Sequence, residues 1–94
     1  MSCDVSLWRL QCFIALAGEL HFGRAAASLF ITQPALSLQI KQLEISLGFE
    51  LAHRARRVTL TEEGCRLLPY AEHVVAAAEV FASAAGERGR LQAA

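Results

Sequence analysis

The apolar positions of the first thirty residues predict two helices. The first helix begins after Ser6, a good N-cap residue, and is expected to stop at Gly18. Its apolar face has the i, i+3, i+4, i+7 spacing of an α-helix and consists of Leu10, Phe13, Ile14 and Ala17. A shorter second helix is expected from about Gly23 to Leu29.

A third helix is predicted from Thr32, a good N-cap residue, to about Leu47, with Gly48 as its end. Pro34 falls in the first turn, where its missing N–H costs nothing. One stripe of this helix is apolar and consists of Leu36, Ile40, Leu43 and Leu47. Leu38 lies roughly 200° from Leu36 on the same helix, since each residue turns the chain by about 100°. It is therefore expected to face water or a partner.

The stretch FELAHRARRVTLT predicts a short β-hairpin. It alternates apolar and polar residues, and Val58 and Leu60 are expected to point inward. The arginines of this stretch are expected to gather at the turn.

A last helix is predicted to begin at Thr61. Apolar residues then repeat in steps of 4, 3, 4, 3 and 4, which is a heptad seam of Leu67, Ala71, Val74, Ala78, Phe81 and Ala85. Pro69 lies inside this helix and is expected to break one backbone hydrogen bond or bend the helix. The tail 89–94 is expected to be loose.

The composition is that of one small folded domain. The chain has 94 residues, of which 54% are hydrophobic and 19% charged. Its apolar runs are too short to span a membrane, and we expect no signal peptide. The net charge is zero, but residues 1–60 carry six basic and four acidic side chains (+2), and residues 61–94 carry three basic and five acidic (−2). Three arginines crowd into Arg54–Arg57, and such a local field matters more than the total charge.

Neither the cysteines nor the histidines predict a chemical site. The three cysteines (Cys3, Cys12 and Cys65) are odd in number and lack paired spacing, which argues against a disulfide framework. The three histidines (His21, His53 and His73) share no i, i+3 or i, i+4 spacing with each other or with a cysteine. A metal site and a Cys–His nucleophile pair are therefore not expected. No paired acid and base groups stand out, so we expect neither an enzyme nor a cofactor.

The order of elements predicts a mainly α, winged helix-turn-helix fold with a long C-terminal dimerisation helix. The expected division is a DNA-binding domain over residues 1–60, a linker and dimerisation helix over 61–88, and the tail. Ala26 is small enough for two helices to cross, and Phe30 stands in the turn, where glycine is common.

The stretch ELHFGRAAASLFITQPALSLQIKQLEISLGFELAHRARRVTLTEEG resembles the DNA-binding domain of LysR-type transcriptional regulators. The resemblance covers about residues 7–85. It rests on the AA before a leucine, the TQPALS entry to the third helix, the QLE and LG at its exit, the R-x-x-R at Arg54–Arg57 and the LTEEG that opens the last helix. It implies a bacterial, cytoplasmic, nucleoid-associated regulator that is a homodimer through the last helix and commonly a tetramer at full length. It also implies a separate effector-binding domain, which this chain lacks, so we expect the chain to be an N-terminal part of a longer protein.

Three positions depart from the family pattern. The family usually has arginine in place of Leu38 and phenylalanine in place of Ala52. One residue is missing between Arg57 and Val58, so the tip of the hairpin, or wing, is expected to be shorter.

These features give a set of expected DNA contacts. At the start of the third helix Gln33 can bond an adenine edge, and Pro34, Ala35 and Leu38 can meet a thymine methyl. Thr32 and Ser37 can approach phosphate or base, and each also has an ordinary role on the helix. Lys41 and Arg24 are candidate phosphate contacts or plain surface charges. Arg54 and Arg57, or Arg56 if the tip is rotated, are expected to enter the minor groove.

The heptad seam is too long for this small body to cover alone, which favours a second copy over packing within one chain. Two copies would read an inverted-repeat operator on double-stranded DNA. The alternative is a protein-interaction module that acts through the long helix, with an incidental basic wing.

Overall fold

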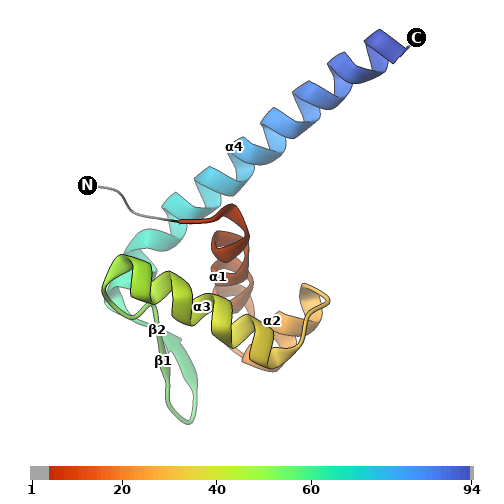
Figure 1. Cartoon of the computed structure of the whole chain (residues 1–94). Helices are drawn as coiled ribbons and strands as arrows, with labels where there is room; N and C mark the ends of the chain where they lie inside the picture. The colour runs from red at the N-terminus through yellow and green to blue at the C-terminus, as the bar shows by residue number, and fades with distance from the viewer. Residues whose placement is uncertain (1–4, 94) are drawn as a thin grey trace.

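The computed structural model describes residues 5–93 and the side chains of residues 5–87. Its elements are α1 (Leu7–Glu19), α2 (Phe22–Ser28), α3 (Gln33–Leu47), β1 (Ala52–Arg54), β2 (Val58–Leu60) and α4 (Glu62–Ala93). The first three helices form a small body, the β-hairpin projects from one side of it, and α4 leaves the body as a long rod (Figure 1). The predicted element order, with a long last helix, is confirmed.

Two predicted helix starts and one predicted end are confirmed by their capping contacts. The Ser6 hydroxyl oxygen accepts a hydrogen bond from the Arg9 N–H at 3.1 Å, and the Thr32 hydroxyl oxygen accepts one from the Ala35 N–H at 3.2 Å. Each contact satisfies a backbone donor that the first helical turn leaves unpaired. Gly48 ends α3 with φ +88°, a value that glycine adopts without strain.

The end of α1 was predicted wrongly. The helix continues through Gly18 to Glu19, and Leu20 takes the left-handed conformation with φ 49°. The Leu20 N–H then donates to the Leu16 carbonyl oxygen at 2.7 Å, which closes the helix. A glycine lowers helix stability without forcing a stop, so the well-packed face of α1 carries the helix past it.

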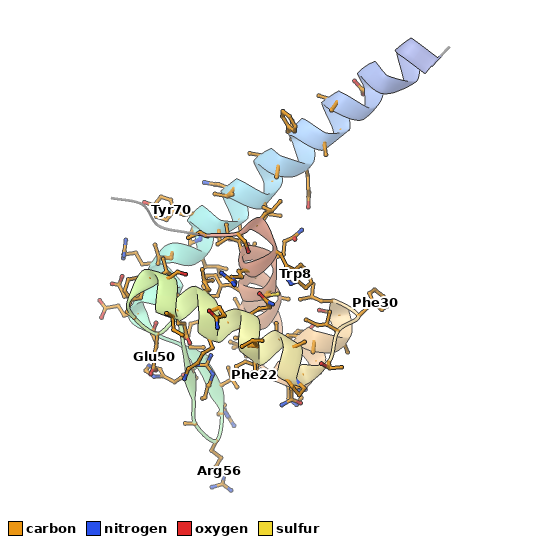
Figure 2. The ribbon with its side chains drawn as sticks, viewed as in Figure 1. Trp8, Phe22, Phe30, Glu50, Arg56 and Tyr70 are labelled. Carbon is orange, nitrogen blue, oxygen red and sulfur yellow. The ribbon has the colours of Figure 1, made fainter. Side chains whose placement is uncertain are left out.

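α2 begins and ends one residue earlier than predicted. Its N-cap is His21, whose Nδ1 accepts a hydrogen bond from the Arg24 N–H at 2.9 Å. The turn that follows α2 contains Phe30 at φ 58°, so a phenylalanine holds the left-handed conformation that glycine favours. Its side chain is 96% exposed and points away from the body (Figure 2).

The core lies where α1, α2 and α3 meet. α1 contributes Phe13 and Leu16, and α2 contributes Ala25 and Ala26, all buried. The predicted apolar stripe of α3 packs against them, with Leu36, Ile40 and Leu43 buried and Leu47 half-buried. The small alanines of α2 allow its backbone to approach its neighbours closely. This packing fixes the orientation of α3 and leaves its opposite face outward.

The hairpin is antiparallel, with Ala52 opposite Leu60 and Arg54 opposite Val58. Leu51 and Ala52 are buried, and Val58 and Leu60 are half-buried, so the inward positions predicted for this stretch are confirmed. Ala52, at the position where the family pattern has phenylalanine, is completely buried against the core. The hairpin is therefore anchored at its base and free at its tip.

α4 begins against the hairpin and runs continuously through Pro69 to Ala93. The tail was predicted to be loose from residue 89, but residues 89–93 are helical, and residue 94 lies outside the described part of the chain. Glu87, Leu91 and Gln92 favour helix, and one glycine at position 89 costs only about 1 kcal/mol. Among the described residues, none of the helices has the length and apolar character needed to cross a membrane.

Candidate nucleic-acid interface

The outward face of α3 carries the predicted recognition residues. Gln33, Pro34, Leu38 and Lys41 are exposed, and Ala35 and Ser37 are half-buried on the flank. Leu38 is 54% exposed, although the other leucines of α3 are buried or half-buried. A helix with a buried stripe and an accessible N-terminal half can enter a groove with that half foremost.

The tip of the wing is a three-residue turn of Ala55, Arg56 and Arg57, all exposed. Arg56 lies at the far end of the hairpin and points away from the body (Figure 2). No ion pair is formed by either arginine with another described residue. Both charges are therefore available to a partner.

A concave surface joins the beginning of α2 to the wing. It brings together four of the predicted DNA contacts, Arg24, Gln33, Arg56 and Arg57, and adds His21 and Gly23. A side chain at position 23 would crowd this surface, because a Cβ there would lie 2.9 Å from His21 Cε1 and 3.4 Å from Gln33 Oε1. The sequence interpretation left out His21, although a polar residue just before a helix is a signal for an N-cap.

Arg24 is partly engaged within its own chain. Its Nε lies 3.4 Å from a Glu19 carboxylate oxygen, and its Nη2 donates to the Glu19 carbonyl oxygen at 3.3 Å. Both side chains are well exposed, so water screens this pair and leaves it weak.

Arg54 lies differently from the other wing arginines. Its Nη2 is 2.9 Å from Glu44 Oε1 on α3, and its guanidinium carbon is 5.5 Å from the centre of the Phe22 ring. It is thus turned toward the body, whereas the sequence alone grouped it with Arg57 as an outward contact.

The predicted seam of α4 has two parts. Leu67 is half-buried and Ala71 is buried, and both pack against the core of their own chain. Farther along, Val74 is 50% and Phe81 77% exposed, Ala78 is half-buried and Ala85 is exposed. Beyond Val74, which still lies beside Val5 and Leu10, the second part presents an apolar surface that the core formed by the described residues leaves largely uncovered.

The described residues include no group of three or more acidic, histidine or cysteine side chains that could hold a metal ion. Burial raises the pKa of the Cys12 thiol to about 11, so this cysteine is not a thiolate near neutral pH. Cys65 is a free thiol on the surface of α4, and Cys3 lies outside the described residues. What the geometry brings together is basic and hydrogen-bonding groups on one side of the molecule.

Residues 7–65, more than half of the chain, match the family model of bacterial regulatory helix-turn-helix proteins of the lysR family. The chain belongs to this family. The LysR-type chain is 47% identical, over 91 residues, to the transcriptional regulator XapR of Escherichia coli K12, covering 88% of its own length and 30% of XapR. It spans 28 to 49% of the first four curated relatives it matches.

Solved structures of LysR-type proteins share the fold. A mutant of OxyR from Corynebacterium glutamicum matches with a TM-score of 0.83 at 43% identity, covering 86% of this chain and 26% of OxyR. The DNA-binding domain of BenM, solved in complex with a catB site 1 DNA, matches with a TM-score of 0.84 at 35% identity and covers 90% of this chain and 97% of that domain. The winged helix-turn-helix fold with a long C-terminal helix is thereby confirmed.

Proposed function

We propose that this LysR-type chain is a binding module, not an enzyme, that recognises double-stranded DNA as a dimer within a bacterial transcription regulator. The observation that carries the proposal is the placement of the exposed face of α3 beside a wing tipped by Arg56 and Arg57. The BenM domain, whose structure contains DNA, shares the fold that carries this face and wing.

The first half of α3 suits the major groove. Gln33 can make two hydrogen bonds to adenine, and Pro34, Ala35 and Leu38 offer apolar contact to a thymine methyl. Thr32 caps the helix by accepting the Ala35 N–H, and Pro34 has no N–H, so the Gln33 N–H is the first-turn donor that can meet a phosphate. Ser37 and Lys41 can reach phosphate as well.

The wing suits the adjacent minor groove. Arg56 and Arg57 are the exposed charges at its tip, and a narrow minor groove has the strongly negative potential that attracts arginine. Arg24 and the concave surface beneath the wing would then follow the phosphate backbone between the two grooves.

The exposed part of the α4 seam, from Val74 to Ala85, suits a second copy of the chain. Two copies present two α3 helices, so the operator is expected to be an inverted repeat with half-sites one helical turn or a multiple apart. A longer protein with this module would be a cytoplasmic regulator, with a tetramer as its assembled form.

Titration of the chain against random double-stranded DNA at low salt tests the proposal. Non-specific binding that weakens steeply with salt is expected, because basic side chains displace counterions from the backbone. Absence of binding at low salt would instead favour a protein-interaction module that acts through α4.

Arg57→Met is expected to weaken DNA binding and to reduce the salt dependence. Each phosphate neutralised contributes about 0.9 to the slope of log K against log salt, so the slope should fall by about that amount per protomer. Fluorescence anisotropy across a salt series measures it. Arg66→Met is the matched control, since Arg66 is an exposed arginine of α4 that pairs with Glu63. An unchanged slope in Arg57→Met, or an equal change in the control, would contradict the assigned surface.

Leu38→Arg is expected to tighten binding and steepen its salt dependence, because arginine adds a charge and can bond guanine at two points. The wild-type chain should select an A·T pair opposite Leu38. Selection from randomised duplexes by both forms checks this, with a change of about 1–3 kcal/mol in discrimination at that base pair. A strict guanine selected by the wild-type chain would refute the assigned role of Leu38.

A further inference from the structure

We infer that Arg54 is a positioning residue, which fixes the wing relative to the recognition helix α3 and does not itself contact DNA. The inference deepens the proposed function and rests on it. The arginines of the wing then have two roles. Arg54 is the brace, meaning the side chain that holds the wing against α2 and α3, and Arg56 and Arg57 are the residues that contact DNA.

The first observation is a buried carboxylate at the base of the wing. Glu44 on α3 is only 7% exposed, and among the described residues it is the buried charged side chain. Its Oε2 accepts hydrogen bonds from the backbone N–H of Leu51 at 2.7 Å and of Ala52 at 3.3 Å. These two residues lead directly into β1, so the recognition helix holds the hairpin by its backbone.

The second observation is the partner of that carboxylate. The other oxygen of Glu44, Oε1, lies 2.9 Å from Arg54 Nη2 at the end of β1. Glu44 therefore holds both ends of the strand, the backbone at its start and the side chain at its finish. Two N–H donors and one guanidinium engage both oxygens of the carboxylate, and the guanidinium offsets its charge.

The third observation is the contact with α2. The Arg54 guanidinium stands over the Phe22 ring, and Phe22 is the first residue of α2. A planar cation on an aromatic face is attracted by the ring quadrupole. Figure 2 shows Phe22 between the start of α2 and the hairpin. One side chain thus joins α2, α3 and β1.

The Arg54 side chain is 31% exposed, but a direct contact with DNA would compete with both of these contacts. If Arg54 turned toward DNA, it would leave the buried Glu44 carboxylate without its cation and abandon the Phe22 ring. The pair Glu44 and Arg54 is neutral as a unit, so the outward charge of the wing comes from Arg56 and Arg57. Because the tip has only three residues, a change of angle at the base would carry both arginines away from the groove.

The test compares Arg54→Met, Arg57→Met and the double variant on a duplex that the wild-type chain has selected from randomised DNA. Methionine keeps the length and apolar character of the arginine stem and removes the charge. Arg54→Met should lower the affinity about fivefold to tenfold, because the displaced wing loses the contacts of Arg56 and Arg57, and its salt slope should equal that of the double variant. The two substitutions should also be less than additive: once the brace is gone, Arg57→Met should cost no more than about twofold.

A second measurement does not depend on DNA. Backbone ¹⁵N relaxation of residues 53–59 in the free chain should show lower order parameters in Arg54→Met, and wild-type values in Arg57→Met. If Arg54→Met fails to fold, Arg54→Lys takes its place, because lysine keeps the charge and lacks the planar fork that pairs with Glu44 and lies on Phe22.

The outcomes are distinguishable. A salt slope that falls by a further 0.9 or so between Arg54→Met and the double variant would make Arg54 and Arg57 independent phosphate contacts and overturn the inference, with about 0.9 expected for each phosphate contact. Additive effects on binding, or unaltered order in the hairpin, would overturn it as well. Failure of the wild-type chain to bind any duplex at low salt would overturn the proposed function, whatever the relaxation data show for the brace.

Discussion

Phe81→Glu is expected to dissociate the proposed dimer. Phe81 is 77% exposed in the single chain and lies at the centre of the unpartnered part of the α4 seam. In a two-fold dimer the substitution would place two carboxylates in an apolar interface without a cation. Burial of unpaired charges costs several kcal/mol, so we expect a loss of at least about 3 kcal/mol. The dimer dissociation constant would rise at least about a hundredfold.

Analytical ultracentrifugation over a concentration series measures this loss, and titration on a two-half-site duplex shows whether cooperative binding disappears with it. Ser83→Glu is the matched control. It adds the same charge to the same stretch of α4, about 200° around the helix from Phe81. Equal effects of the two substitutions, or a wild-type chain that is monomeric at high concentration, would count against the seam as the interface.

Gly64→Ala is expected to destabilise the fold strongly. A Cβ at Gly64 would overlap the Leu51 carbonyl oxygen and lie 3.2 Å from the Leu51 carbonyl carbon. Neither atom can move freely, because the same oxygen accepts a hydrogen bond from the Thr61 N–H at 2.9 Å. We expect the free energy of unfolding to fall by about 3 kcal/mol, the upper part of the range for overpacking. The gain in helix propensity, about 1 kcal/mol, does not offset this loss.

Thermal or urea unfolding at one fixed protein concentration measures the effect of Gly64→Ala. Gly18→Ala is its control, because Gly18 lies inside α1 and a Cβ there would meet no atom within 4 Å. That substitution should stabilise the chain by about 0.5–1 kcal/mol. A Gly64→Ala chain as stable as the wild type would show that α4 can shift away from the hairpin at little cost.

The helices and the hairpin could be predicted because local signals coincide there with tertiary packing. Thr32, Pro34 and Gly48 mark the limits of α3, and the stripe from Leu36 to Leu47 shows which face is inward. The end of α1 could not be predicted in this way. Gly18 offered a plausible stop, but the chain turns at Leu20, where the closing hydrogen bond and the packing of α1 outweigh the strain of a left-handed leucine.

The candidate site was predictable in its composition but not in its internal pairing. A sequence shows that three arginines lie close together, and it does not show that one of them meets a buried carboxylate. Glu44 and Arg54 are ten residues apart and meet only after the hairpin folds back on α3. Likewise the heptad pattern of α4 is uniform, and only the structure shows that Leu67 and Ala71 are used by the chain's own core.

The brace has a consequence for the thermodynamics of association. A loop that becomes ordered on a partner gives up conformational entropy at that moment, and the affinity falls accordingly. In this chain the base of the wing is already held by Glu44 before any partner arrives, and its tip is only three residues long. The wing therefore has little conformational entropy left to lose on binding. A short wing reaches less far than a long one, but it is already ordered in the conformation that binds.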